Sequence, residues 1–127
     1  PLRIDDHEQA AALGGRYVPR AFDAALEAAV AALAEPIMAL PGGGRAHIAL
    51  TPALVAIDVD LGGAAGPGAG RGGGKAAAHR AVNLAAIPAL VRAIVLRELG
   101  GAILIDFAGL AGRREKLLGP ALAAALA

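Results

Sequence analysis

LVAIDVD (54–60) and AILIDF (102–107) are the two stretches that decide the fold, because each is an apolar run that carries an acid near its end. Such short runs are typical of buried strands. Between them, residues 75–98 carry apolar side chains at helical spacing, which predicts one long helix. A strand, a helix and a strand in this order almost always form a parallel, right-handed unit. We therefore expect Asp58 and Asp106 at the same edge of one sheet.

The stretch before this unit predicts a different kind of strand pairing. RAHIAL (45–50) alternates apolar and other residues, as a half-buried strand does. The link from this stretch to 54–60 is too short for a crossover, so the two strands should pair antiparallel. The predicted fold class is therefore α/β, with a mixed sheet of antiparallel strands followed by a right-handed βαβ unit.

Helices are predicted near both ends of the chain. Asp5 or Asp6 suits the N-cap of a short helix, since a carboxylate there accepts hydrogen bonds from the first turn. Residues 22–35 have apolar side chains on one helical stripe. Residues 113–126 are predicted as the last helix, which Pro120 should split because proline has no N–H to donate.

The acids at the strand ends suggest a metal site. Asp58 and Asp60 share one face of their strand, since side chains alternate with a period of two. Together with Asp106 they would repel one another unless a cation lay between them. Magnesium suits such hard oxygen ligands, because it commonly takes one or two protein carboxylates together with waters and phosphate oxygens. The alternative is that each aspartate caps the loop or helix that follows it.

The Gly-rich loop 61–74 fits no nucleotide-binding motif. A P-loop ending at Lys75 would need Gly at 69 and Ser or Thr at 76, and both positions are Ala. A dinucleotide turn is also disfavoured, because no acid lies about 20 residues further on. The loop is either a plain linker or a segment that approaches an RNA phosphate. In the second case Arg71, Lys75 and Arg80 are the candidate RNA-binding residues.

Composition excludes several classes of site. The chain has no Cys, so it has neither disulfides nor Cys-based zinc sites. Aromatic residues make up only 2% of the chain, which disfavours an RNA binder that stacks bases on aromatic rings. The three His residues are isolated in sequence. The half from residue 61 onward is basic, which suits either phosphate or a solvated helix face.

No segment is expected to enter a membrane. The first residues are charged, and the most apolar stretch, 81–99, contains Arg92, Arg97 and Glu98, which is too polar for a span of about 20 residues. We therefore expect a cytoplasmic protein with no membrane partner.

Three segments resemble the catalytic core of the ribonuclease E/G family. They are LPGGGRAHIALTPALVAIDVD (40–60), Asn83-Leu84 and LRELGGAILIDF (96–107). The family pattern is LxSGGxxxIxxTEALxxIDVN, a linker, a TNLEA segment on a long helix, and then LRxLGGxIxIDF. Residues 1–36 match the preceding family segment more loosely, as a helical N-terminal segment. The resemblance implies a single α/β domain over 1–127, with a DNase I-like core over 37–127.

The resemblance also implies an activity, the magnesium-dependent endonucleolytic cleavage of single-stranded RNA. The two metal-binding aspartates of the family match Asp58 and Asp106, with manganese as the alternative ion. The family asparagine that orients the first of these carboxylates matches Asp60. Family subunits associate, so a homo-oligomer is one expectation. The zinc link between family subunits is not expected here, because the chain has no Cys.

Departures from the family pattern leave two other functions open. Asp60 stands where an asparagine would donate a hydrogen bond, and an ionised aspartate has no donor. Pro52 replaces a glutamate, Gly109 replaces an acid, and 61–63 differ from the residues that follow the asparagine. The alternatives are a non-catalytic RNA-binding or regulatory relative, and a structural or assembly module of a longer ribonuclease.

Overall fold

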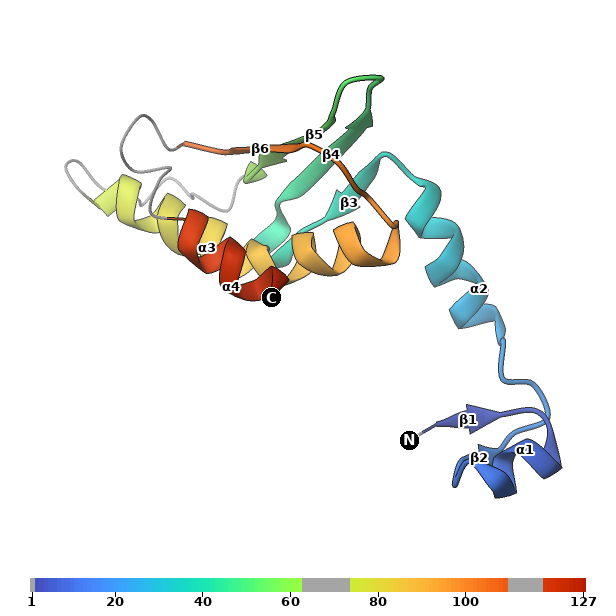
Figure 1. The fold of residues 1–127 in the computed structure, drawn as a ribbon. Coiled ribbons are helices and arrows are strands. Elements are labelled where there is room, and N and C mark those ends of the chain that lie inside the picture. The colour runs from blue at the N-terminus through green and yellow to red at the C-terminus, as the bar shows by residue number, and fades with distance from the viewer. Residues whose placement is uncertain (1, 63–73, 110–117) are drawn as a thin grey trace. The chain divides into compact units, whose positions relative to one another are not determined.

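The computed structural model describes residues 2–62, 74–109 and 118–127. It divides into two compact units, Pro1–Ala32 and Leu33–Ala127, which are described separately (Figure 1). We call them unit 1 and unit 2. Their boundary lies near the predicted limit between the N-terminal segment and the core. The single domain expected over 1–127 stays a prediction.

Unit 1 contains two very short paired strands and the short helix that connects them. Strand β1 (Arg3–Ile4) lies parallel to β2 (Arg16–Tyr17), with α1 (His7–Ala12) between them in sequence. Asp6 caps α1, because its carboxylate accepts a hydrogen bond of 2.8 Å from the Gln9 N–H. This confirms one of the two caps expected from the sequence.

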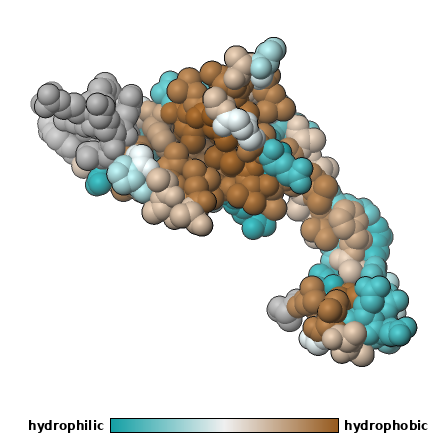
Figure 2. Space-filling view, viewed as in Figure 1, coloured by the Kyte–Doolittle hydropathy of each residue, from teal (hydrophilic) through white to brown (hydrophobic). Residues whose placement is uncertain are grey.

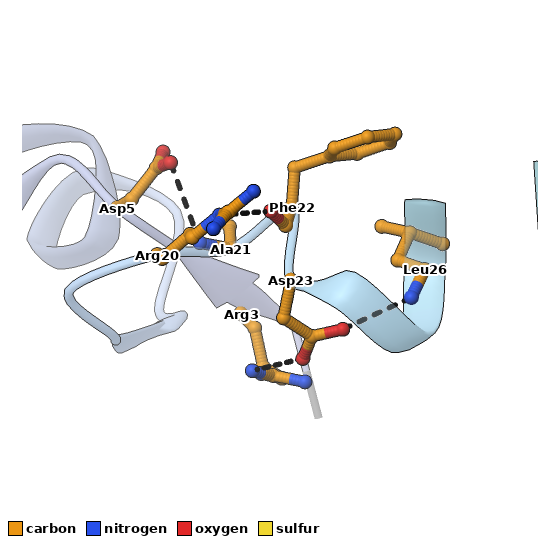
Figure 3. A network of polar contacts seen from close by, with 7 residues as sticks. All are labelled: Arg3, Asp5, Arg20, Ala21, Phe22, Asp23 and Leu26. Atoms are coloured by element: carbon orange, nitrogen blue, oxygen red, sulfur yellow. Dashed lines mark hydrogen bonds and ion pairs between the residues drawn. The ribbon is translucent and has the colours of Figure 1, made fainter. Parts of the chain in front are cut away.

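Polar contacts fix the start of the second helix of unit 1 (Figure 3). Helix α2 (Ala24–Ala31), followed by the 3-10 turn η1 (Ala32–Ala34), lies within the predicted helix 22–35. Asp23 accepts hydrogen bonds of 3.0 Å from the Leu26 N–H and 3.0 Å from Arg3. The bond from Leu26, and then the Arg3 guanidinium, hold the pKa of the Asp23 carboxyl below its ordinary value. A lowered pKa in the folded state adds to the free energy of unfolding at neutral pH, and this contribution is lost as the pH falls through the pKa of Asp23.

Unit 2 is built on a four-stranded mixed sheet with the strand order β3-β4-β5-β6. The strands are β3 (Ile37–Ala39), β4 (Arg45–Leu50), β5 (Val55–Asp60) and β6 (Ile103–Phe107), with a 3-10 turn η2 (Pro41–Gly43) after β3. The first three strands are antiparallel and the β5–β6 pair is parallel. The predicted antiparallel pair, β4–β5, is confirmed, and so is the predicted parallel pair, β5–β6, whose strands the crossover helix joins. Only β3 was not foreseen as a strand, because three residues show no clear periodicity.

Helix α3 (Gly74–Leu96) connects the two parallel strands and continues through Pro88. Beyond it the chain turns at Glu98, whose φ is 52°, and the Leu99 N–H donates to the Ile94 carbonyl over 3.0 Å. These bounds agree closely with the predicted helix 75–98.

Helix α4 (Gly119–Leu126) corrects the expected role of Pro120. The proline lies in the first turn of α4, where its missing N–H would have no partner within the helix in any case. Pro120 therefore lies at the start of this helix and not inside it. The part of the predicted helix before Leu118 lies outside the described residues.

The hydrophobic core of unit 2 lies between the sheet and its two helices. Figure 1 shows α3 and α4 together on one face of the sheet. Alternate residues of each strand point to this inner face, so Ile48 in β4 and Ile57 and Val59 in β5 are buried there. From α3, Ile87 and Leu90 fill the other side of the same cluster. The α/β class with a mixed sheet is confirmed.

One prediction about α3 needs correction. By length and composition alone, Ala77–Leu96 is apolar enough to cross a membrane, with a mean hydropathy of 1.4, so the polarity argument made from 81–99 was too strong. The core helix of a soluble protein passes the same test, however, and Ile87, Leu90 and Ile94 of this helix belong to the core cluster. Packing in this core accounts for the buried part of the apolar window, which is 33% of it, whereas Val95 and Leu96 of the same helix are exposed.

Unit 2 also exposes apolar side chains. Figure 2 shows apolar surface, in brown, across much of the visible part of this unit. We call the sheet face opposite the core the outer face. Ile37 and Leu104 lie on it, and they are 46% and 61% exposed. Large exposed apolar patches often mark contact surfaces in proteins.

Candidate functional site

The two predicted metal-binding carboxylates lie side by side on the outer face. The register of the parallel pair sets Asp58 directly beside Asp106. Both residues are exposed, whereas Ile57, Val59 and Phe107 next to them in sequence are buried. Register partners on neighbouring strands point to the same face of a sheet, and such strands lie about 4.8 Å apart. The juxtaposition expected from the crossover argument is therefore present.

A shallow hollow surrounds these carboxylates at the ends of β5 and β6. It is open to solvent, has a volume of about 600 Å³, and includes Asp58, Asp60 and Asp106 in its lining. The backbone of Ala108 and Gly109, which follows β6, forms part of the same wall. The site thus lies at the exposed carboxyl ends of β5 and β6, where an extended ligand can reach it.

Asp60 has a local structural role. Its Oδ1 accepts a hydrogen bond of 2.8 Å from the Gly62 N–H, so it closes the turn that leaves β5. This is the capping alternative raised from the sequence, and it holds for Asp60. Among the residues that the structure describes, no hydrogen bond reaches the carboxylate of Asp58 or Asp106, so these two aspartates show no capping role there.

The donor set of Asp58 and Asp106 fits a magnesium ion. Two exposed carboxylates offer hard oxygen ligands and leave room for water and phosphate oxygens, as magnesium sites usually do. Within 2–62, 74–109 and 118–127, no group of three or more acid, His or Cys side chains is arranged to hold a metal. Asp60 lines the same hollow while its Oδ1 accepts from the Gly62 N–H, and its role as a supporting ligand stays a prediction.

Two basic side chains on β4 were missed by sequence reasoning. The antiparallel register sets His47 beside Asp58 and Arg45 beside Asp60, and both side chains are exposed on the outer face. His47 had been interpreted only as an isolated histidine. The sequence did contain a signal for these neighbours, because the short link between the two antiparallel strands constrains which residues lie opposite one another.

The three predicted RNA-binding residues differ in where the structure places them. Arg71 lies outside the described residues, and Lys75 lies in the first turn of α3. Arg80 is exposed on α3, which covers the inner face of the sheet and not the outer face with the carboxylates. The structure does not bring Arg80 into the lining of the hollow around Asp106.

Two further residues of α3 contact the backbone beyond Asp106. Asn83 is fully buried, and its Nδ2 donates to the Ala108 carbonyl over 3.0 Å. The His79 Nδ1 lies 3.3 Å from the Gly109 carbonyl oxygen. Gly109 has a φ of +68°, and a Cβ built there would lie 1.8 Å from the His79 Nδ1. A side chain at position 109, where the resembling family has an acid, is thus excluded while His79 keeps this position.

Comparison with known proteins gives two matches. The family model described as Ribonuclease E/G family matches residues 10–119. The chain is also 41% identical over 80 residues to the Ribonuclease E/G-like protein, chloroplastic, of Arabidopsis thaliana. That match covers 62% of this chain and 8% of the plant protein, so the chain corresponds to a small part of that relative. The plant protein is named as chloroplastic, so it gives no support to the cytoplasmic location expected here.

Proposed function

This chain belongs to the ribonuclease E/G family, and we propose that it carries the catalytic carboxylates of a magnesium-dependent endoribonuclease that cleaves single-stranded RNA. The observation that supports the proposal best is the register pair of Asp58 and Asp106 on the outer face. The α/β core over 37–127 would then correspond to the DNase I-like subdomain of the family.

The roles of the residues follow from their positions. Asp58 and Asp106 would hold the ion, and the turn closed by Asp60 would keep the end of β5 in place beside them. When bound, magnesium stabilises charge on the scissile phosphate and lowers the pKa of water, and manganese supplies the same chemistry. Because Asp58 and Asp106 are exposed at an open hollow, an unpaired RNA strand can reach them without opening the core.

RNA contact would rest on basic side chains. Arg45 and His47 flank the carboxylates on the outer face. Arg71 and Lys75 remain candidates proposed from the sequence, whereas Arg80 does not line the hollow and could contact only RNA that extends beyond it. With so few cations and few aromatic residues, binding should be weak and should fall steeply as salt rises.

The activity itself is the first prediction. At low salt, the purified chain should slowly cleave an unstructured RNA oligonucleotide when magnesium or manganese is present, and not when EDTA is added. The measurement is gel analysis of an end-labelled RNA, with 5′-phosphate ends expected on the downstream products. Salt-sensitive RNA binding without cleavage would instead favour the regulatory alternative.

Replacing Asp60 by the family residue should raise the cleavage rate. In Asp60→Asn the amide oxygen can still accept the hydrogen bond from Gly62, so the turn should persist. The new amide NH₂ can donate to a neighbouring carboxylate, and a negative charge near the phosphate is removed. We expect a gain of about threefold to tenfold, equivalent to roughly 1 kcal/mol of transition-state stabilisation.

The matched control is Glu98→Gln, which removes one exposed carboxylate of unit 2 from outside the strands. It should leave the rate unchanged. A rate for Asp60→Asn at or below that of the wild type would show that the aspartate is adapted to the site, and would count against the family role assigned to position 60.

A role in assembly is the second candidate, and one observation favours it. Ile37 and Leu104 expose apolar surface on the outer face of unit 2. Such a surface suits contact with another subunit, or with a further part of a longer ribonuclease. Concentration-dependent dimerisation in sedimentation experiments, together with no cleavage, would favour this reading over the enzyme.

A further inference from the structure

The segment Ala108–Gly109 connects the candidate site to helix α3. It follows β6 directly and lines the same hollow as Asp106. Asp106 is exposed, and among the described residues no side chain donates a hydrogen bond to its carboxylate. The direction of this carboxylate therefore depends on how the strand end and the two residues after it are held.

Asn83 holds the first of these residues from inside the core. It is the only buried polar or charged residue in the described part of the chain, and its Nδ2 donates to the Ala108 carbonyl over 3.0 Å. The Oδ1 of the same amide is also buried, with no hydrogen-bond partner among the described residues. A buried amide oxygen without a hydrogen-bond partner destabilises the folded state, because it has lost its hydrogen bonds to water and gained none in return. Core stability alone therefore does not account for an amide at position 83.

His79, which lies one helical turn before Asn83 on α3, contacts Gly109. Residues 79 and 83 are four apart on α3 and so lie on the same helix face. The His79 Nδ1 lies 3.3 Å from the Gly109 carbonyl oxygen, and a carbonyl can only accept, so this contact requires the proton on Nδ1. The left-handed φ of Gly109 and the missing Cβ leave the space that the imidazole fills.

From these contacts we propose that Asn83 and His79 are positioning residues for the metal-binding carboxylate of Asp106, acting through the backbone of Ala108–Gly109. This inference rests on the proposed function of the site. Both contacts originate from one face of α3, so packing of this helix sets the end of β6 and thereby the place of Asp106 beside Asp58. Displacements of about 1 Å can cost an active site on the order of 100-fold in rate.

The test uses manganese alone as the probe, so it does not depend on RNA cleavage. In Asn83→Leu the branching and the number of side-chain heavy atoms are kept, but the donor to Ala108 is lost. We expect Mn²⁺ affinity, measured by EPR titration of the whole chain, to fall about tenfold, as loss of a ligand-orienting partner usually does. Ile94→Val is the matched control, since it alters another buried residue of α3, and its affinity should stay within about twofold of the wild type.

Equal Mn²⁺ affinities of Asn83→Leu and the wild type would overturn the inference. If Asn83→Leu does not fold, His79→Ala serves instead, because His79 is only partly buried; a fall of at least threefold supports the inference and no fall overturns it. If the wild type binds no Mn²⁺, the proposed metal site fails, and NMR then decides the positioning role. The wild type should show the Nδ1-protonated form of His79, and the Asp106 carboxyl resonance should shift in Asn83→Leu or His79→Ala. An unmoved Asp106 resonance in the folded variant would overturn the inference.

Discussion

Asp106→Asn should abolish magnesium-dependent cleavage while leaving the fold intact. An amide oxygen is neutral and binds magnesium far more weakly than a carboxylate, and the register pair with Asp58 would be left with one charged ligand. Losing several kcal/mol of charge stabilisation corresponds to a rate loss on the order of 100-fold or more. The side chain is exposed, so the substitution should change the free energy of unfolding by less than about 0.5 kcal/mol.

The measurement pairs an RNA cleavage assay with thermal melting followed by circular dichroism. Glu98→Gln is again the control, because it neutralises an exposed carboxylate of unit 2 that does not line the hollow around Asp106. Equal cleavage by Asp106→Asn and the wild type would show that a contaminant or another site is responsible. If both are inert, the chain is not a nuclease by itself, and the regulatory and assembly functions become the working hypotheses.

Leu90→Ala should destabilise unit 2 by about 2–5 kcal/mol, which is a large share of the stability of a small domain. Leu90 is fully buried, with 0% exposed, in the cluster that joins α3 to the sheet. Truncation removes apolar contacts and leaves a cavity that packed neighbours fill only in part. Urea denaturation followed by circular dichroism measures the change.

Val95→Ala on the same helix is the control for this prediction. Val95 is 64% exposed, so truncation there should cost less than about 1 kcal/mol. Equal effects of the two substitutions would mean that α3 does not pack on the sheet through the face that carries Leu90.

The strands and the crossover helix could be predicted because their signals are local. The apolar runs 54–60 and 102–107 need only neighbouring residues to be recognised, and the link between the antiparallel strands is too short for any other pairing. Two short strands, β2 and β3, were not foreseen because two or three residues carry no period. The place of Pro120 in the first turn of α4 was not foreseen, because the sequence pattern did not show where this helix begins.

What the sequence determined by itself was the class of fold and the pair of acids, Asp58 and Asp106, near the ends of two parallel strands. Tertiary structure alone decided the register that sets them side by side and the contact of Asn83 with Ala108. The physical reason is that periodicity depends on neighbours along the chain, whereas register depends on residues far apart in sequence. Asn83 and Ala108 meet only because α3 packs its apolar face on the sheet, and the long helix then brings its polar residues to the end of β6.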